Sequence, residues 1–234
     1  MKVLRIFEDA IDWIYRIIFI LIMLIGLYYV YDTIYVFYNA SAERYMVSGQ
    51  TGYSEDVVKE LTEDYVAWLS IDDTNINYPI MQGETNSSYL NTNPYGEYSL
   101  SGSIFMDSRN AYDFSDSYNL IYGHHMANNF MFGALDQFYD EEYLLAHDKG
   151  TILTKDGVEY ALDIFACIKT DAEIDVIFNP QGSFAALGYI KTFELAKLPA
   201  NEHLVALSTC LEPGSTTRTV VFGTIEEIGG STNE

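Results

Sequence analysis

The chain has 234 residues and a formal net charge of -22, with 12 Lys and Arg against 34 Asp and Glu. Residues 45–234 carry eight of the basic residues and 29 of the acidic ones. Such a charge disfavours nucleic acid or anionic lipid as a partner of this region and is typical of a solvated surface. The two cysteines, Cys167 and Cys210, are too few for a disulfide-stapled scaffold, although a single disulfide between them stays open.

The first element in chain order is an apolar segment at residues 17–38, in which Asp32 is the only charge. Its length matches the roughly 20 residues that a helix needs to cross the hydrocarbon core. Basic residues within 1–16 precede it, so the positive-inside tendency predicts a cytoplasmic N-terminus and a domain outside the cell. A cleaved signal peptide with a small-residue site at 40–42 is the alternative, and it gives the domain the same location.

These features divide the chain into four parts. We expect a cytoplasmic N-terminus at 1–16, a transmembrane anchor at 17–38, a stalk or linker at 39–54 and an extracellular folded domain at 55–230. The protein is then a single-pass protein of the cell membrane.

The folded domain has the pattern of a mostly β protein. A helix is expected from Ser54, because Val57, Val58, Leu61, Tyr65, Trp68 and Leu69 recur at helical spacing. Two short helices are expected around 130–145 and 183–197. Strand-like runs, separated by Gly, Asn and Asp, are 75–81, 103–106, 118–123, 151–154, 158–168, 204–209 and 219–227. Seven or eight short strands with few helices indicate a closed or nearly closed β-barrel.

Three chemically active side chains lie at strand ends. Cys210 follows the run 204–209, Arg218 opens the next run, and His124 follows Gly123 after a third. A cysteine attacks acyl groups as a thiolate, which a neighbouring imidazole can generate, and a guanidinium can hold the resulting oxyanion. Each residue alone has a simpler explanation: a buried thiol, a loop histidine, or a surface arginine paired with Glu212.

The other histidines fit this site less well. His125 is adjacent to His124 and should point away from it, since neighbouring side chains diverge on an extended backbone. His147 and His203 are read as loop or core residues. No Cys and His spacing in the chain resembles a zinc site.

The combination of Leu-Ser-Thr-Cys, an Arg at the head of the next strand and Tyr-Gly-His upstream resembles the sortases, which are membrane-anchored cysteine transpeptidases of Gram-positive cell surfaces. The similarity covers roughly residues 55–228, and further motifs in the same order resemble the class B branch. These motifs are Tyr78–Gly83, Ser88–Asn91, Gly102–Asp107, Ile121–Met126 and Met131–Gly133. The resemblance implies an eight-stranded barrel with an N-terminal helix and a helix before the cysteine strand.

The resemblance also implies the reaction and its residues. Cys210 is the expected nucleophile on the Thr carbonyl of a C-terminal sorting motif of a secreted protein, and an amine of peptidoglycan or a pilin then resolves the thioacyl enzyme. His124 is expected to act as general acid and base, and Arg218 to stabilise the oxyanion. The family needs no metal or other cofactor for this chemistry. Five positions match residues that line the family's substrate groove: Asn86, Leu90, Tyr122, Ser208 and Thr209.

The chain departs from the family pattern directly after the cysteine. Class B members often carry an acidic residue there, whereas this chain has Leu211 followed by Glu212. A third catalytic member is therefore not assigned. Two other functions stay open: an extracellular cysteine peptidase that uses the same Cys–His pair with water, and a membrane-tethered binding module whose thiol is incidental.

Overall fold

The structure is a computed structural model that describes residues 2–45, 53–174, 176–190, 203–209 and 216–228. It separates into two compact units, Met1–Tyr38 and Asn39–Glu234. The first unit consists of most of α1, an uninterrupted helix over Lys2–Ala40. Within the described residues, Glu8–Ala40 of this helix is long and apolar enough to cross a membrane. Its Ile, Leu and Phe side chains are largely exposed, as the lipid-facing side chains of an anchor would be.

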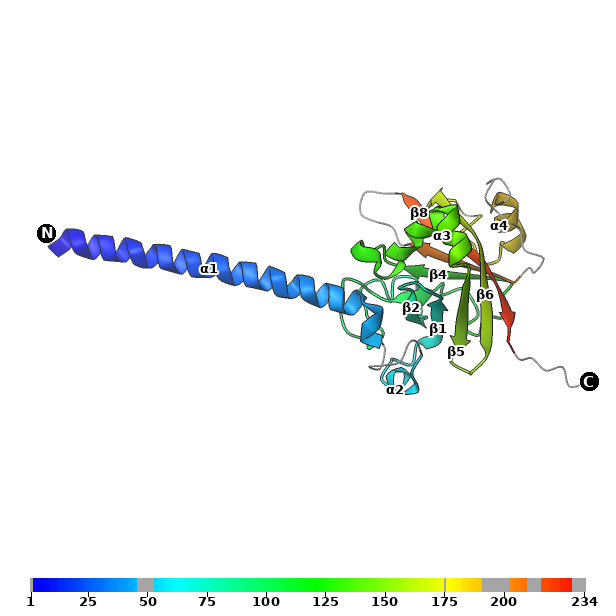
Figure 1. Cartoon of the computed structure of the whole chain (residues 1–234). Helices are drawn as coiled ribbons and strands as arrows, with labels where there is room; N and C mark the ends of the chain where they lie inside the picture. The colour runs from blue at the N-terminus through cyan, green and yellow to red at the C-terminus, as the bar shows by residue number, and fades with distance from the viewer. Residues whose placement is uncertain (1, 46–52, 175, 191–202, 210–215, 229–234) are drawn as a thin grey trace, which may run out of the picture. The chain divides into compact units, whose positions relative to one another are not determined.

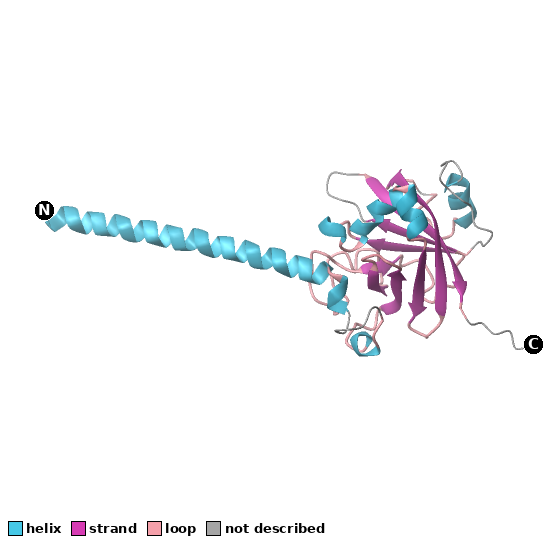
Figure 2. Ribbon diagram, viewed as in Figure 1, coloured by secondary structure: helices cyan, strands magenta, loops and turns pink. Residues whose placement is uncertain are grey.

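The second unit is built around a β-barrel (Figures 1 and 2). In the described part of the chain, eight strands close in the order β1-β2-β3-β4-β7-β8-β6-β5. The β2–β3 and β4–β7 pairs are parallel, and the other pairs are antiparallel. The strands are β1 (Tyr65–Ile71), β2 (Asn77–Met81), β3 (Ile104–Met106), β4 (Tyr118–Gly123), β5 (Lys149–Thr154), β6 (Glu159–Asp171), β7 (Leu204–Thr209) and β8 (Thr217–Glu227). The predicted eight-stranded barrel is confirmed.

Short helices cover parts of the barrel. They are η1 (Ala42–Tyr45), α2 (Glu55–Val58), η2 (Ala127–Asn129), η3 (Phe132–Tyr139), α3 (Glu141–Ala146) and α4 (Ser183–Ile190). The helix expected around 130–145 is two helices, because Asp140 ends η3 and caps α3 by accepting a hydrogen bond from the backbone N–H of Tyr143. η3 lies against β6, β7 and β8. The described part of the helix expected at 183–197 is α4, and residues 191–202 lie outside the described residues.

The helix expected from Ser54 through Leu69 is wrong beyond Val58. Residues 65–71 form β1, which pairs with β2 on one side and β5 on the other. All but one of its side chains are buried, so its apolar residues run consecutively and do not alternate. A contiguous apolar run fits helical spacing as well as it fits a strand buried on both faces. The β-favouring Tyr65, Val66 and Trp68 were the available signal for a strand.

The beginning of the second unit is tied to the barrel. Tyr45 is 1% exposed, and its hydroxyl donates to the backbone carbonyl of Asn39. The hydroxyl of Tyr78 on β2 donates to the carbonyl of Ala40 at 2.9 Å. Residues 39–45, part of the range expected to form a stalk, thus bury side chains in the globular unit.

Strand β4 ends in a crowded position. A Cβ atom at Gly123 would lie 2.4 Å from Cδ1 of Ile104 and 2.8 Å from Cγ of Phe132. We therefore expect Gly123→Ala to lower the free energy of unfolding by about 1–3 kcal/mol, the usual cost of overpacking. Urea unfolding of the detergent-solubilised chain measures this change. Gly188→Ala is the matched control, because Gly188 lies in α4 with open space around its Cα; unchanged stability in both variants would contradict the packing argument.

Candidate active site

The parallel pairing of β4 with β7 brings the ends of both strands, with their predicted site residues, to the same end of the barrel. Tyr122 lies opposite Ser208, and Gly123 lies opposite Thr209. His124 follows the first strand directly, and Thr209 is the last described residue of the second. Cys210, the predicted nucleophile, comes next in the sequence and lies outside the described residues, as do Leu211 and Glu212.

Arg218 lies at the same end of the barrel, near the start of β8. Its Nη1 lies 3.5 Å from the carbonyl oxygen of Thr209, which is a long and weak hydrogen bond. The neighbouring Thr219 fixes the strand more firmly, because its backbone N–H donates to the hydroxyl of Thr209 at 3.1 Å. Arg218 therefore lies beside the end of β7. Its buried Nε has no hydrogen-bond partner among the described residues.

The predicted residues surround one groove. The groove has a volume of about 360 Å³ and takes its walls from five separate segments of the chain. Its lining residues are Asn86, Leu90, Asn91, Phe105, Arg109, Tyr122, His124, Ala172, Phe178 and Arg218. Five of the predicted site residues are in this set. Ser208 and Thr209 are not in the set, and both are buried in β7.

A backbone carbonyl fixes the orientation of the His124 ring. Nε2 of His124 lies 2.7 Å from the carbonyl oxygen of Leu90. A carbonyl can only accept, so Nε2 carries the proton and Nδ1 is left as the atom that can take up or release one. Gly102 allows this arrangement: its φ is +57°, and a Cβ there would lie 2.4 Å from the same Leu90 oxygen.

The other histidines have partners away from the groove. His125 Nε2 contacts a carboxylate oxygen of Asp136 at 2.8 Å, and His203 Nε2 contacts a backbone carbonyl at 2.7 Å. Nδ1 of His147 donates to the backbone carbonyl of Tyr143, and the imidazole stacks on the Tyr143 ring, with the two ring centroids 3.9 Å apart. Within the described residues, no group of three His, Cys, Asp or Glu side chains is placed to hold a metal ion.

The ring contacts predict opposite tautomers for two histidines. At a pH where both rings are neutral, we expect the proton of His124 on Nε2 and that of His147 on Nδ1. Nitrogen-15 NMR of ring-labelled protein distinguishes the two forms in a single spectrum, with His147 as the internal control. A proton on Nδ1 of His124 would rule out the Leu90 contact.

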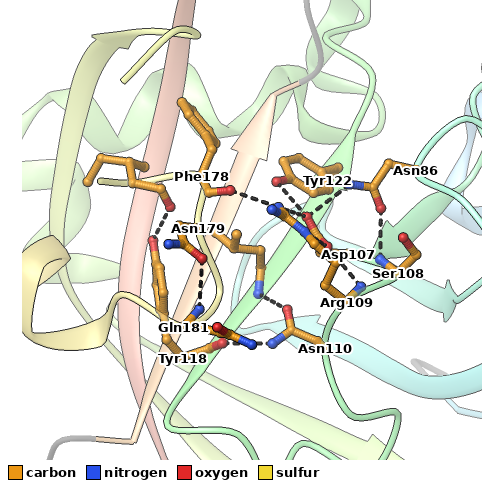
Figure 3. Close-up of polar contacts among 12 residues, drawn as sticks. Asn86, Asp107, Ser108, Arg109, Asn110, Tyr118, Tyr122, Phe178, Asn179 and Gln181 are labelled. Carbon is orange, nitrogen blue, oxygen red and sulfur yellow. Dashed lines mark hydrogen bonds and ion pairs between the residues drawn. The ribbon is translucent and has the colours of Figure 1, made fainter. Parts of the chain in front are cut away.

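A buried carboxylate, Asp107, binds several side chains of the groove wall, and Figure 3 shows these polar contacts. The side chain of Asp107, directly after β3, is fully buried. It accepts from Nε and Nη2 of Arg109, both at 2.8 Å, from Nδ2 of Asn86 at 2.9 Å and from the hydroxyl of Tyr122 at 3.1 Å. Burial raises the pKa of Tyr122, so its hydroxyl stays protonated and donates.

The charge of Asp107 is retained despite its burial. Burial alone would raise the pKa of this carboxyl, but the hydrogen bonds from Arg109 and Asn86 outweigh it and hold the pKa below its usual value. The available sequence signal was an arginine two residues after an aspartate in an otherwise acidic chain, at the end of the Gly102–Asp107 motif. That signal does not say which partners the carboxylate has.

Loss of the Asp107 charge should destabilise the protein in a pH-dependent way. A carboxyl with a lowered folded-state pKa stabilises the fold above its unfolded pKa of about 3.9, and this stabilisation is lost as pH falls through the folded-state pKa. We expect Asp107→Asn to lower the free energy of unfolding by about 2 kcal/mol at pH 7. Urea unfolding from pH 7 down to pH values below about 4 should show the difference from wild type shrinking.

The control for this variant is Asp156→Asn, which removes the same charge at an exposed turn. It should leave stability nearly unchanged. If the difference between Asp107→Asn and wild type were the same at every pH, the ionised carboxylate would not be the source of the stabilisation.

Cys167 does not resemble a reactive thiol. It is a free cysteine on β6, 5% exposed. Burial, with a smaller contribution from the nearby Asp136, raises the pKa of the Cys167 thiol to about 12. The thiol is therefore protonated and a poor nucleophile at neutral pH.

Comparison with known proteins gives a consistent result. A model of the sortase domain family matches residues 69–226. The chain is 33% identical over 182 residues to sortase B of Listeria monocytogenes, covering 74% of this chain and 73% of that protein. Among solved structures, a class B sortase of Streptococcus pyogenes involved in pilus biogenesis matches with a TM-score of 0.69 and 42% identity, over 76% of this chain and all of that one. A sortase B–substrate complex from Staphylococcus aureus matches with a TM-score of 0.66 and 29% identity, over 74% and 84% of the two chains.

Proposed function

The chain belongs to the sortase family and to its class B branch, and from this membership we propose that it is a membrane-anchored cysteine transpeptidase. The proposed enzyme cleaves a C-terminal sorting motif of secreted proteins after Thr and joins the new carboxyl end to an amine. One observation carries the proposal beyond family membership. His124 and Arg218 line one groove at the end of the barrel where β4 and β7 finish. Thr209, the last residue of β7, directly precedes Cys210 in the sequence.

The proposed nucleophile is the thiolate of Cys210. Its sulfur forms a bond to the carbonyl carbon of the Thr, and the carbonyl electrons move to oxygen to give a tetrahedral oxyanion. When the carbonyl re-forms, the C–N bond breaks, the tail leaves as an amine and a thioester remains on the enzyme. Attack by the second amine reverses these steps and releases the thiol.

His124 is proposed to move the protons of both half-reactions. The leaving nitrogen needs a proton, and the incoming amine must lose one, so a single imidazole can act first as acid and then as base. The Leu90 carbonyl holds the Nε2 proton in place, and Nδ1 is therefore the atom assigned to this exchange. This carbonyl takes the orienting role that an acidic residue has in other nucleophile–histidine sites.

Arg218 is proposed to bind the oxyanion or a carbonyl of the motif. Its buried Nε without a partner is a donor in need of an acceptor, which a substrate oxygen would supply. Within the described residues no carboxylate pairs with this guanidinium, so its charge is available to the developing negative charge.

The groove is proposed to bind the sorting motif as an extended peptide. Asn86 lines it with an amide that is held from both ends: Oδ1 accepts from the backbone N–H of Ser108 at 2.7 Å, while Nδ2 donates to Asp107. Its second N–H remains for a substrate carbonyl. Leu90 and Tyr122 add apolar surface beside it. The S. aureus relative is known as a sortase B–substrate complex, and this supports the proposal that the fold binds a substrate.

The proposed location is the outer face of the cell membrane. Residues 17–38 would form the anchor, 1–16 would lie in the cytoplasm and the domain within 55–230 would lie outside. The amine is proposed to come from a pilin or from peptidoglycan. The chain is 42% identical to the S. pyogenes class B sortase that is involved in pilus biogenesis and 33% identical to the L. monocytogenes sortase B. This difference favours the pilin amine.

Transpeptidation can be tested with a panel of sorting-motif peptides and amines. We expect the full chain in detergent to join at least one peptide to an amine, detected by mass spectrometry. Cys210→Ala should abolish turnover. His124→Ala should lower kcat by about 10²–10⁴-fold and Arg218→Ala by about 10²–10³-fold, since these are the usual costs of losing a general acid–base group or an oxyanion donor.

The control is Cys167→Ala, which removes the buried thiol and should leave turnover unchanged. Normal turnover by Cys210→Ala would contradict the proposed mechanism. Hydrolysis alone, with every peptide and amine offered, would favour the cysteine peptidase reading. The absence of any thioacyl enzyme would leave only a binding function.

A further inference from the structure

We propose that Phe178 is a positioning residue: its ring holds the Arg218 guanidinium in the groove, and the Asp107–Arg109 ion pair holds Phe178. The inference rests on the proposed role of Arg218. It assigns a function to the segment between β6 and β7, of which Ala172 and Phe178 line the groove.

Two successive carbonyls fix the backbone at Phe178. The hydroxyl of Tyr118, fully buried on β4, donates to the carbonyl of Ile177 at 2.8 Å. Nη2 of Arg109 donates to the carbonyl of Phe178, also at 2.8 Å (Figure 3). Tyr118 lies on β4 and Arg109 follows β3, so these two hydrogen bonds hold residues 177 and 178 against the barrel.

Arg109 is itself held in one orientation. It binds Asp107 through Nε and Nη2, a bidentate contact that defines the plane of the guanidinium. Asp107 is anchored in turn, because its backbone N–H donates to the carbonyl of Leu120 on β4 at 2.8 Å. A continuous set of hydrogen bonds therefore joins β4 to the backbone of Phe178.

The ring of Phe178 lies beside the Arg218 guanidinium. The guanidinium carbon lies 5.0 Å from the ring centroid, within the range of about 6 Å for cation–π attraction. The other contact of this guanidinium, to the Thr209 carbonyl, is long at 3.5 Å. A carboxylate partner would occupy N–H donors and neutralise the charge, whereas a ring face orients the cation and leaves its donors free for a substrate oxygen.

The test replaces the ring while keeping an apolar side chain. We expect Phe178→Leu, in the full chain in detergent, to slow thioacyl formation in single-turnover experiments by about 10-fold, and Phe178→Tyr to restore the rate to within about twofold. The loss in the acylation rate constant should exceed any change in KM for the peptide, because the ring acts mainly on the transition state through Arg218. Tyr98→Leu, at a largely exposed aromatic, is the control and should have no effect.

A double variant separates this role from direct contact with the peptide. In an Arg218→Ala background, Phe178→Leu should have no further effect on acylation. A second 10-fold loss there, or a wild-type rate in Phe178→Leu alone, would overturn the proposal. If the wild type forms no thioacyl enzyme with any peptide, the proposed function fails instead, so the two failures are distinguishable.

A spectroscopic readout does not depend on activity. The ring current of Phe178 should shift the Arg218 side-chain resonances in the wild type, and this shift should disappear in Phe178→Leu. Arg109→Met should reduce both the shift and the acylation rate. Because that variant leaves Asp107 buried without its cation and could fail to fold, the Phe178 variants decide the outcome.

Discussion

The parallel register of β4 and β7 is the constraint on which the candidate site depends. These strands are about 80 residues apart in sequence, and their six paired positions end at Gly123 opposite Thr209. Because side chains alternate between faces, a slip of one residue would turn Tyr122 away from the groove and bury a different set of residues. The pairing of β8 with β7 then places Arg218 at the same end of the barrel. The site is therefore a product of sheet topology more than of local sequence.

The carboxylate of Asp107 connects stability to the site. A buried charge is tolerated only when hydrogen bonds replace its lost hydration, and here donors from Arg109, Asn86 and Tyr122 do so. All three of those residues line the groove. The interactions that offset the desolvation of Asp107 thus also fix the orientation of groove side chains, so this wall is preorganised without a ligand.

The sequence predicted two strands of the site more accurately than the contacts between its side chains. Strands 118–123 and 204–209 were predicted with the observed bounds, because each is a short, mostly apolar run with a clear end in the sequence. β1 was predicted as helix, since a strand buried on both faces loses its alternation. The contacts of Phe178 with Arg109 and Arg218 could not be predicted, because they join residues 40 to 69 positions apart through a backbone carbonyl and a ring face. Neither leaves a pattern in a single sequence.

The electrostatic setting explains why an aromatic ring suits the position beside Arg218. In a chain of net charge -22, the surrounding field disfavours a thiolate and an oxyanion, so the proposed reaction, which would form both, needs a local cation. Arg109 cannot serve, because Asp107 neutralises it through a bidentate contact. Arg218 is held by a neutral ring and has no ion pair within the described residues, so its charge is not cancelled there. One arginine thus stabilises a buried carboxylate, and the other is left available for the negative charge that the proposed reaction would develop.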